Sequence, residues 1–201
     1  GTFGQVSAHN GSIQHDAVDL SLPGRRLSIA LQRTVIAQDS FDGPFGRGFD
    51  FNYRQRLEPL GEDVLAYGQR LPLVMRDEDT NNEIAAARDV LLYSGGGRTF
   101  YFHYAGTTKP TQYGNDPLLT QLQWDDTKIG AYYLPQDGLF ELLKRFKTGQ
   151  FVRLTGDGAQ YHYSPGGRLE KIIDRYDTNF IEIKYNKEGE LVRAEDQDAR
   201  F

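Results

Sequence analysis

Two stretches near the end of the chain share one pattern: Tyr163-Ser164-Pro165-Gly166-Gly167-Arg168-Leu169 and Tyr185-Asn186-Lys187-Glu188-Gly189-Glu190-Leu191. A tyrosine, a glycine and a leucine recur at matching places, 22 residues apart. The same offset relates Asp174 to Asp196. Because several residue types match in order at one fixed period, this segment is predicted to be a structural repeat.

Each repeat is predicted to form a strand, a turn and a second strand. Residues 180–185 run into the polar turn 186–189, and residues 191–194 leave it. A less regular copy precedes them at residues 152–163, around Asp157-Gly158. A lone hairpin cannot bury one of its faces, so such units must stack in a larger sheet. We therefore expect the edge after Leu191 to receive another strand, and these 201 residues to be the first part of a longer protein.

The rest of the chain also favours β structure. Alternating apolar residues and turn clusters predict strands at residues 18–22, 27–36, 49–57, 64–67 and 71–76, and a hairpin formed by residues 88–93 and 98–105. Residues 107–137 are predicted to form a long loop that holds one weak strand at 118–124, whereas residues 139–146 fit a helix or a strand equally well. The expected fold is thus mainly β with antiparallel hairpins, divided into an opening region, 1–150, and repeat units, 151–201.

The composition agrees with this fold class and excludes several functions. The chain has 12 Tyr, 12 Phe, 1 Trp and 22 Gly, a mixture that suits pleated strands and tight turns. It has no Cys, which excludes disulfides, thiolate metal sites and a cysteine nucleophile. A net charge of −5 with scattered Lys and Arg argues against nucleic acid. There is no apolar run of about 20 residues and no signal peptide, so we expect a soluble chain without a membrane segment.

No constellation of residues predicts catalysis. The four histidines, His9, His15, His103 and His162, lack the spacing of a zinc site, and those at 103 and 162 are expected to be exposed or hydrogen-bonded strand residues. Residues 77–88 begin like a calcium loop but lack its sixth-position glycine and its final glutamate. We therefore predict no catalytic residue, no cofactor-binding residue, no metal ligand and no cofactor, and expect the chain not to be an enzyme.

The repeat resembles a known family. Gly167-Arg168-Leu169, Asp174-Arg175-Tyr176-Asp177, Tyr185-Asn186 and Gly189-Glu190-Leu191 resemble the tyrosine-aspartate (YD) repeat of Rhs proteins. Upstream, Asp19-Leu20-Ser21-Leu22-Pro23-Gly24, Arg33-Thr34 and Gly43-Pro44-Phe45-Gly46-Arg47-Gly48-Phe49 are similar to the segment that opens the Rhs core. The chain departs from the family at Val35-Ile36-Ala37, where Tyr-Asn-Ser is usual, and at Phe49, where Trp is frequent.

The resemblance implies a β-sheet shell that encloses a C-terminal toxic or effector domain delivered to competing cells or hosts. This chain would form the first part of the shell and would contact the rest of its own polypeptide, the enclosed domain and a secretion apparatus. It would be cytoplasmic in the producing cell and then secreted. Any toxic activity would reside in a domain beyond this chain.

The many aromatic residues and the net negative charge also fit a second function. Exposed tyrosines could form a surface module that binds carbohydrate or a cell-surface partner. This alternative expects Tyr101, Tyr104, Tyr132, Tyr133 and Tyr161 to cluster on one open face.

Overall fold

The computed structural model of the 201-residue chain describes residues 5–6, 13–24, 27–36, 42–43, 46–60, 75–76, 83–84, 89–110, 126–135 and 140–198. The regular secondary structure of these residues is almost entirely antiparallel strand, as the sequence predicts. No helix within these ranges has the length and apolar character needed to cross a membrane.

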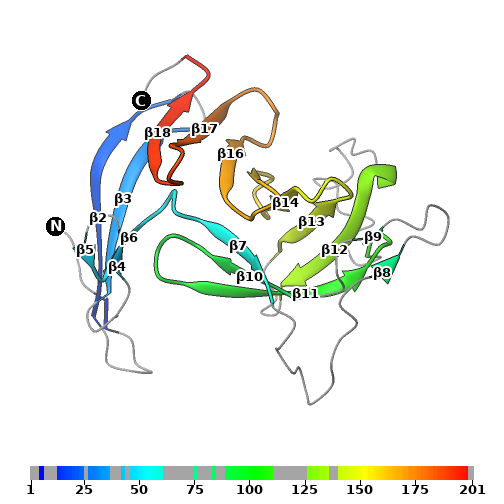
Figure 1. The fold of residues 1–201 in the computed structure, drawn as a ribbon. Helices are drawn as coiled ribbons and strands as arrows, with labels where there is room; N and C mark the ends of the chain where they lie inside the picture. The colour runs from blue at the N-terminus through cyan, green and yellow to red at the C-terminus, as the bar shows by residue number, and fades with distance from the viewer. Residues whose placement is uncertain are drawn as a thin grey trace.

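A four-stranded sheet forms the N-terminal part of the fold (Figure 1). Its order is β1 (Gln5–Val6), β2 (Ile13–Leu22), β3 (Ile29–Ile36) and β6 (Phe49–Phe51). Two short pairs lie outside the main sheets: β4 (Asp42–Gly43) with β5 (Gly46–Arg47), and β8 (Met75–Arg76) with β9 (Glu83–Ile84).

A ten-stranded sheet forms the larger part of the fold, and it curls strongly (Figure 1). Its strands follow one another in chain order except at the first step, where β7 pairs with β10. The strands are β7 (Arg56–Pro59), β10 (Val90–Tyr93), β11 (Thr99–Gly106), β12 (Ile129–Pro135), β13 (Leu142–Phe146), β14 (Phe151–Leu154), β15 (Gln160–Tyr163), β16 (Leu169–Ile173), β17 (Phe180–Tyr185) and β18 (Leu191–Asp196).

One type of turn connects five of these hairpins. The turns start at Ser94, Phe146, Thr155, Ser164 and Asn186, and in each the first N–H donates to the fifth carbonyl over 2.8–3.0 Å. The fourth residue is always a glycine with φ between +70° and +93°. Only glycine reaches this left-handed region without strain, which explains why the repeat keeps one glycine at a fixed place. The two predicted repeat units and the earlier copy are therefore confirmed as hairpins.

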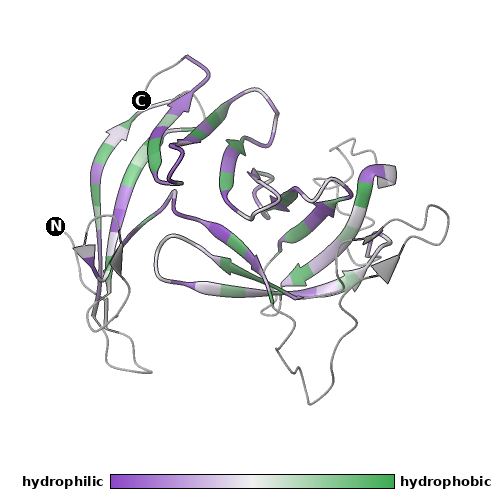
Figure 2. Cartoon of the chain, viewed as in Figure 1, coloured by the Kyte–Doolittle hydropathy of each residue, from purple (hydrophilic) through white to green (hydrophobic). Residues whose placement is uncertain are grey.

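The concave face of the curled sheet holds the main core. Along β10, Val90 and Leu92 are buried and alternate with half-buried Leu91 and Tyr93. β17 alternates in a similar way, whereas all four residues of β14 are buried because both faces of the sheet are covered there. Short apolar and polar bands along the strands are visible in Figure 2. A smaller cluster on the opposite face contains Tyr132 and Leu142.

Most of the predicted strands in the described residues are confirmed. Residues 18–22 and 27–36 lie in β2 and β3, and the hairpin around Ser94-Gly95-Gly96-Gly97 is formed by β10 and β11. The ambiguous residues 139–146 contain a strand, β13. Residues 64–67, 71–74, 77–82 and 118–124 lie outside the described ranges.

The single strand predicted at residues 49–57 is wrong. β6 ends at Phe51, where the side-chain amide of Asn52 donates to the Ala30 carbonyl (2.8 Å) and its oxygen accepts from the Gln32 amide (3.0 Å). The chain then crosses to the other sheet as β7. The alternating sequence pattern predicts one strand because Phe51 and Leu57 are both buried in the same core, although they belong to different sheets.

The long loop predicted at residues 107–137 is also partly wrong. A short 3-10 helix, Asp126–Lys128, leads into β12, which occupies Ile129–Pro135. β12 contains Gly130 and ends at Pro135, residues that usually mark turns, and this composition hid the strand. The predicted boundary at residues 150/151 stays a prediction; β13 and β14, on its two sides, are hydrogen-bonded neighbours.

Candidate functional site

The ten-stranded sheet closes on itself through β7. One edge of β7 pairs with β10, and on its other side the Leu57 amide donates to the Gly167 carbonyl over 2.8 Å. The Leu169 amide donates to the Gln55 carbonyl over 3.3 Å, and Arg56 forms a β-bridge with Arg168. The strands from β7 through β16 thus form a ring, whereas β17 and β18 continue beyond the closure point.

The ring is filled by side chains. Its concave face holds fully buried residues from neighbouring strands, among them Leu92, Phe102, Tyr133, Leu143 and Phe151. A ring of this number of strands is just wide enough for side chains to fill it. The interior of the ring is therefore filled with packed side chains.

A charged network lies within this core, centred on Arg153 of β14. The Arg153 guanidinium lies 3.4 Å from the Glu141 carboxylate and 3.3 Å from Gln55 Oε1, and it stacks 4.2 Å from the centre of the Tyr161 ring. The Tyr163 hydroxyl donates to the same Gln55 oxygen over 3.1 Å. Gln55 immediately precedes β7, so the network ties the closing strand to β14 and β15.

Burial sets the ionisation of this network. Burial raises the pKa of Glu141, although the nearby Arg153 partly offsets the rise. Burial alone would lower the pKa of Arg153, but its interactions with Tyr163 and Glu141 raise the pKa overall. Burial also raises the pKa of Tyr163. Arg153 and Glu141 therefore form a buried ion pair, and the tyrosine stays neutral.

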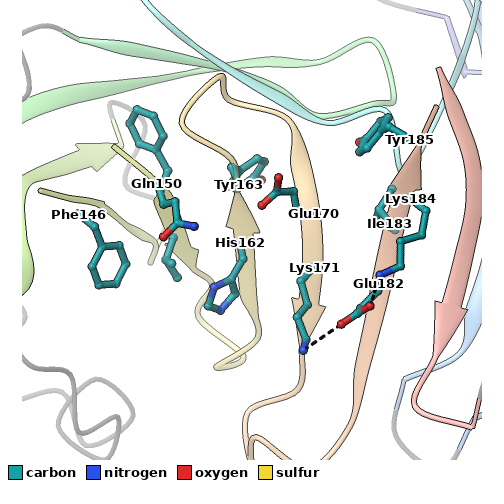
Figure 3. Close-up of a pocket in the computed structure, with 12 residues that line it drawn as sticks. Phe146, Gln150, His162, Tyr163, Glu170, Lys171, Glu182, Ile183, Lys184 and Tyr185 are labelled. Atoms are coloured by element: carbon teal, nitrogen blue, oxygen red, sulfur yellow. Dashed lines mark hydrogen bonds and ion pairs between the residues drawn. The ribbon is translucent and has the colours of Figure 1, made fainter. Parts of the chain in front are cut away.

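A polar pocket of about 660 Å³ opens on the sheet beside the hairpin turns (Figure 3). Phe146 and Gln150 lie on one side of it, and His162 lies between them and the charged groups of β16 and β17. Lys171 Nζ is 3.5 Å from Glu182 Oε1, and the second oxygen of Glu182 pairs with Lys184. The pocket therefore combines an aromatic ring, an amide, an imidazole and charges of both signs.

His162 is the imidazole among the residues that line this pocket. Its Nε2 is 3.3 Å from Gln160 Oε1. The pKa of His162 is lowered from 6.5 to about 4, mainly by burial and also by the positive charge of Lys171, whereas Asp177 opposes the shift. The imidazole is thus neutral near pH 7.

We expect the chain to lose stability as the pH falls from 6.5 towards 4. The unfolded chain binds a proton at His162 in this range whereas the folded chain does not, so acid favours unfolding. The free energy of unfolding should fall by about 2 kcal/mol in all, allowing for partial solvent access. Urea unfolding at steps between pH 7 and pH 5 measures the slope.

His162→Gln should remove most of this slope, whereas His103→Gln should keep it. His103 lies exposed on β11 with its Nδ1 2.8 Å from Asp89 Oδ2, far along the sheet from β15. The measurement stops at pH 5 to keep the effect of His162 separate from that of Glu182. Lys184 lowers the pKa of Glu182, so protonation of Glu182 changes the free energy of unfolding only below the ordinary pKa of 4.5. An unchanged slope in His162→Gln would contradict the assignment.

The turn between β16 and β17 is built around the repeat aspartate Asp174. Its buried carboxylate accepts hydrogen bonds from the amides of Tyr176 (3.1 Å) and Thr178 (3.0 Å) and from the Asn179 side chain (2.6 Å). Burial raises its pKa, but these hydrogen bonds outweigh burial and leave the pKa below its ordinary value. Asp174 is therefore a structural residue of the repeat.

Asp174→Ala should lower the free energy of unfolding by about 2 kcal/mol, because several donors lose a charged acceptor. Chemical denaturation at pH 7 measures the loss. Asp174→Asn keeps the size and part of the acceptor capacity, so it should lose about half as much. Equal stability of Asp174→Ala and the unmodified chain would refute this role.

The structure places the other candidate residues as follows. His15 lies in β2, and His9 lies outside the described residues. The expectation for His103 and His162 is confirmed, because both are hydrogen-bonded strand residues. Within the described ranges, no three His, Asp or Glu side chains converge as metal ligands would.

Sequence reasoning missed the network residues Gln55, Glu141 and Arg153. One signal could have found Arg153: it shares an alternation with Phe151 in the strand 151–154, which places both side chains on one face. An arginine in register with a core phenylalanine indicates a buried, paired cation.

The five tyrosines of the binding alternative do not share one open face. Tyr132 and Tyr133 are buried, and Tyr133 packs edge-on against half-buried Tyr104 with ring centres 5.9 Å apart. Burial raises the pKa of Tyr133 to about 12. Tyr161 stacks on Arg153, and only Tyr101 is largely exposed.

A match to a protein-family sequence model covers the first part of the chain. Residues 4–81 match the sequence model of a domain of unknown function, DUF6531. This segment includes the four-stranded sheet and the closing strand β7. No curated protein matches the chain. The chain is therefore similar, over residues 4–81, to the DUF6531 domain.

Proposed function

We propose that this chain is a non-catalytic wall segment of a β-sheet shell of the Rhs/YD-repeat type, which encloses a C-terminal toxin or effector domain. The observation that carries the proposal is the asymmetry of the ten-stranded sheet. Its first strand, β7, is covered on both sides by β10 and the start of β16. Its last strand, β18, is at the edge of the sheet and follows a repeated hairpin.

Within the part of the chain that the structure describes, the ten-stranded sheet has its unpaired edge at β18, where it can be extended. The closed ring would form the closed end at which the shell begins. Further hairpins would add to β18 by main-chain hydrogen bonds. The repeated glycine turns support this, because each places the next strand antiparallel beside the last. The proposed partners are the rest of the same polypeptide, the enclosed domain and a secretion apparatus that exports the assembly from the producing cell.

Hydrogen exchange on the natural full-length polypeptide tests the proposal. We expect the amides of β18 to exchange much more slowly there than in residues 1–201 alone, because another strand pairs with this edge. We also expect the C-terminal domain to resist trypsin while the shell is folded. Equal exchange of β18 in the two samples, or turnover by the purified chain in a hydrolase screen, would refute the proposal.

The alternative of a carbohydrate-binding surface loses its expected platform of tyrosines, since two of the five are buried. A saccharide would need a different site on the molecule. The pocket of Figure 3 is the part of the described structure that has suitable chemistry.

A further inference from the structure

Apart from Tyr163, the polar residues that line the pocket of Figure 3 have no part in closing the ring, so they call for a separate explanation. Its volume of about 660 Å³ lies within the range of small-molecule sites. It is lined by residues of the hairpins β13–β14, β15–β16 and β17–β18, so its walls come from a rigid sheet.

The charges of the pocket balance one another. Lys171 and Lys184 both pair with Glu182, which uses both of its carboxylate oxygens. Exposed Glu170 adds a second carboxylate and has no ion-pair partner within the described part of the chain. His162 is neutral near pH 7. Two cations therefore face two anions, and the pocket has no net charge to attract an ionic ligand.

The polar groups instead offer donors and acceptors side by side. Each lysine ammonium has three N–H donors and needs only one for Glu182, whereas Glu170 offers acceptors only. The Gln150 amide offers both. Alternating donors and acceptors suit a ligand whose every polar group is both donor and acceptor, which is the property of a hydroxyl.

One wall of the pocket is aromatic. The half-buried ring of Phe146 lies at the opposite side of the pocket from the charged groups, with His162 between them (Figure 3). The face of an aromatic ring is electron-rich and attracts the weakly positive C–H bonds on the flat side of a pyranose. A ligand with a C–H face and a rim of hydroxyls therefore matches both walls.

We propose that this pocket binds a short neutral saccharide, with its ring against Phe146 and its hydroxyls bonded to Gln150, Glu170 and Lys171. The site is independent of the shell proposal, because a wall segment can have such a pocket on its surface or lack it. Glu170 is the best residue for testing this proposal by substitution. Its carboxylate is exposed and forms no hydrogen bond or ion pair with another described residue, so its loss should not affect folding.

Saturation-transfer NMR on the 201-residue chain tests the proposal with four neutral disaccharides: maltose, cellobiose, lactose and diacetylchitobiose. Digalacturonate is the anionic comparator. We expect at least one neutral disaccharide to bind with a dissociation constant below about 10 mM. Glu170→Gln and Gln150→Ala should each raise that constant by about tenfold.

Glu188→Gln is the matched control, because Glu188 is an exposed turn glutamate outside the pocket. It should bind the disaccharide like the unmodified chain. Circular dichroism checks that each variant is folded. The proposal is overturned if no neutral disaccharide binds, if only digalacturonate binds, or if Glu170→Gln and Gln150→Ala bind as well as the control.

Discussion

Gly167→Ala should lower the free energy of unfolding by about 4 kcal/mol, near the upper end for a single substitution. Two causes combine at this position. Gly167 has φ +81°, and a Cβ built on it lies 1.9 Å from the backbone carbonyl oxygen of Leu57. A backbone atom held in a sheet cannot move aside as a side chain can, so the bond between the Leu57 amide and the Gly167 carbonyl must break. Urea unfolding measures the loss.

Gly189→Ala is the matched control for this prediction. Gly189 occupies the same turn position one repeat later, with φ +86°, but its Cβ would meet the Arg168 guanidinium at 2.4 Å. That side chain is exposed and flexible and can turn away, so only the backbone strain of about 1 kcal/mol remains. Hydrogen exchange should show a faster Leu57 amide in Gly167→Ala only. Equal losses in the two variants would contradict closure at Leu57.

Arg153→Ala should also lower the free energy of unfolding by about 3 kcal/mol, because it leaves the largely covered Glu141 carboxylate, whose side chain is 16% exposed, without its cation. Gln55 Oε1 would lose the Arg153 guanidinium as a donor at the same time and keep the Tyr163 hydroxyl. The difference in stability between the variant and the unmodified chain should narrow as the pH falls, since the unpaired Glu141 then takes up a proton while the effect of His162 is common to both. Urea unfolding at pH 7 and pH 5 measures both effects.

The double variant Arg153→Met with Glu141→Leu tests whether the two charges or the packing of the two side chains matter for stability. Both charges are then absent and the space stays occupied, so stability should return to within about 1 kcal/mol of the unmodified chain. A loss below about 1 kcal/mol in Arg153→Ala would mean that the pair behaves like an exposed one. A large loss in the double variant would mean that packing around the guanidinium matters more than its charge.

The hairpins could be predicted from sequence because their causes are local. A glycine at the fourth turn position, between alternating apolar residues, determines each connection by itself. The strands β10, β11 and β15 to β18 were found in this way. β12 was missed because its glycine and proline imitate loop composition, and β6 and β7 were merged because their alternation continues across a change of sheet.

The closure could not be predicted, because its partners are distant in sequence. Nothing near Leu57 indicates that its second edge will meet Gly167. The network around Arg153 could not be predicted for the same reason, because Gln55 and Arg153 are 98 residues apart in the sequence. The outer pocket likewise depends on register: Lys171 and Glu182 become neighbours only because β16 and β17 pair in one alignment.

The contact between Leu57 and Gly167 also determines when the protein can fold. About 110 residues separate the two positions, so at a synthesis rate of about 5–20 residues per second β7 waits roughly 6–20 s for its second neighbour to leave the ribosome. Loops of this length form slowly, and an unpaired strand edge can associate with other nascent chains in the interval. The N-terminal sheet, whose contacts are local, can form much earlier. Ring closure should therefore be the slow step of folding, and the step at which chaperones protect the nascent chain.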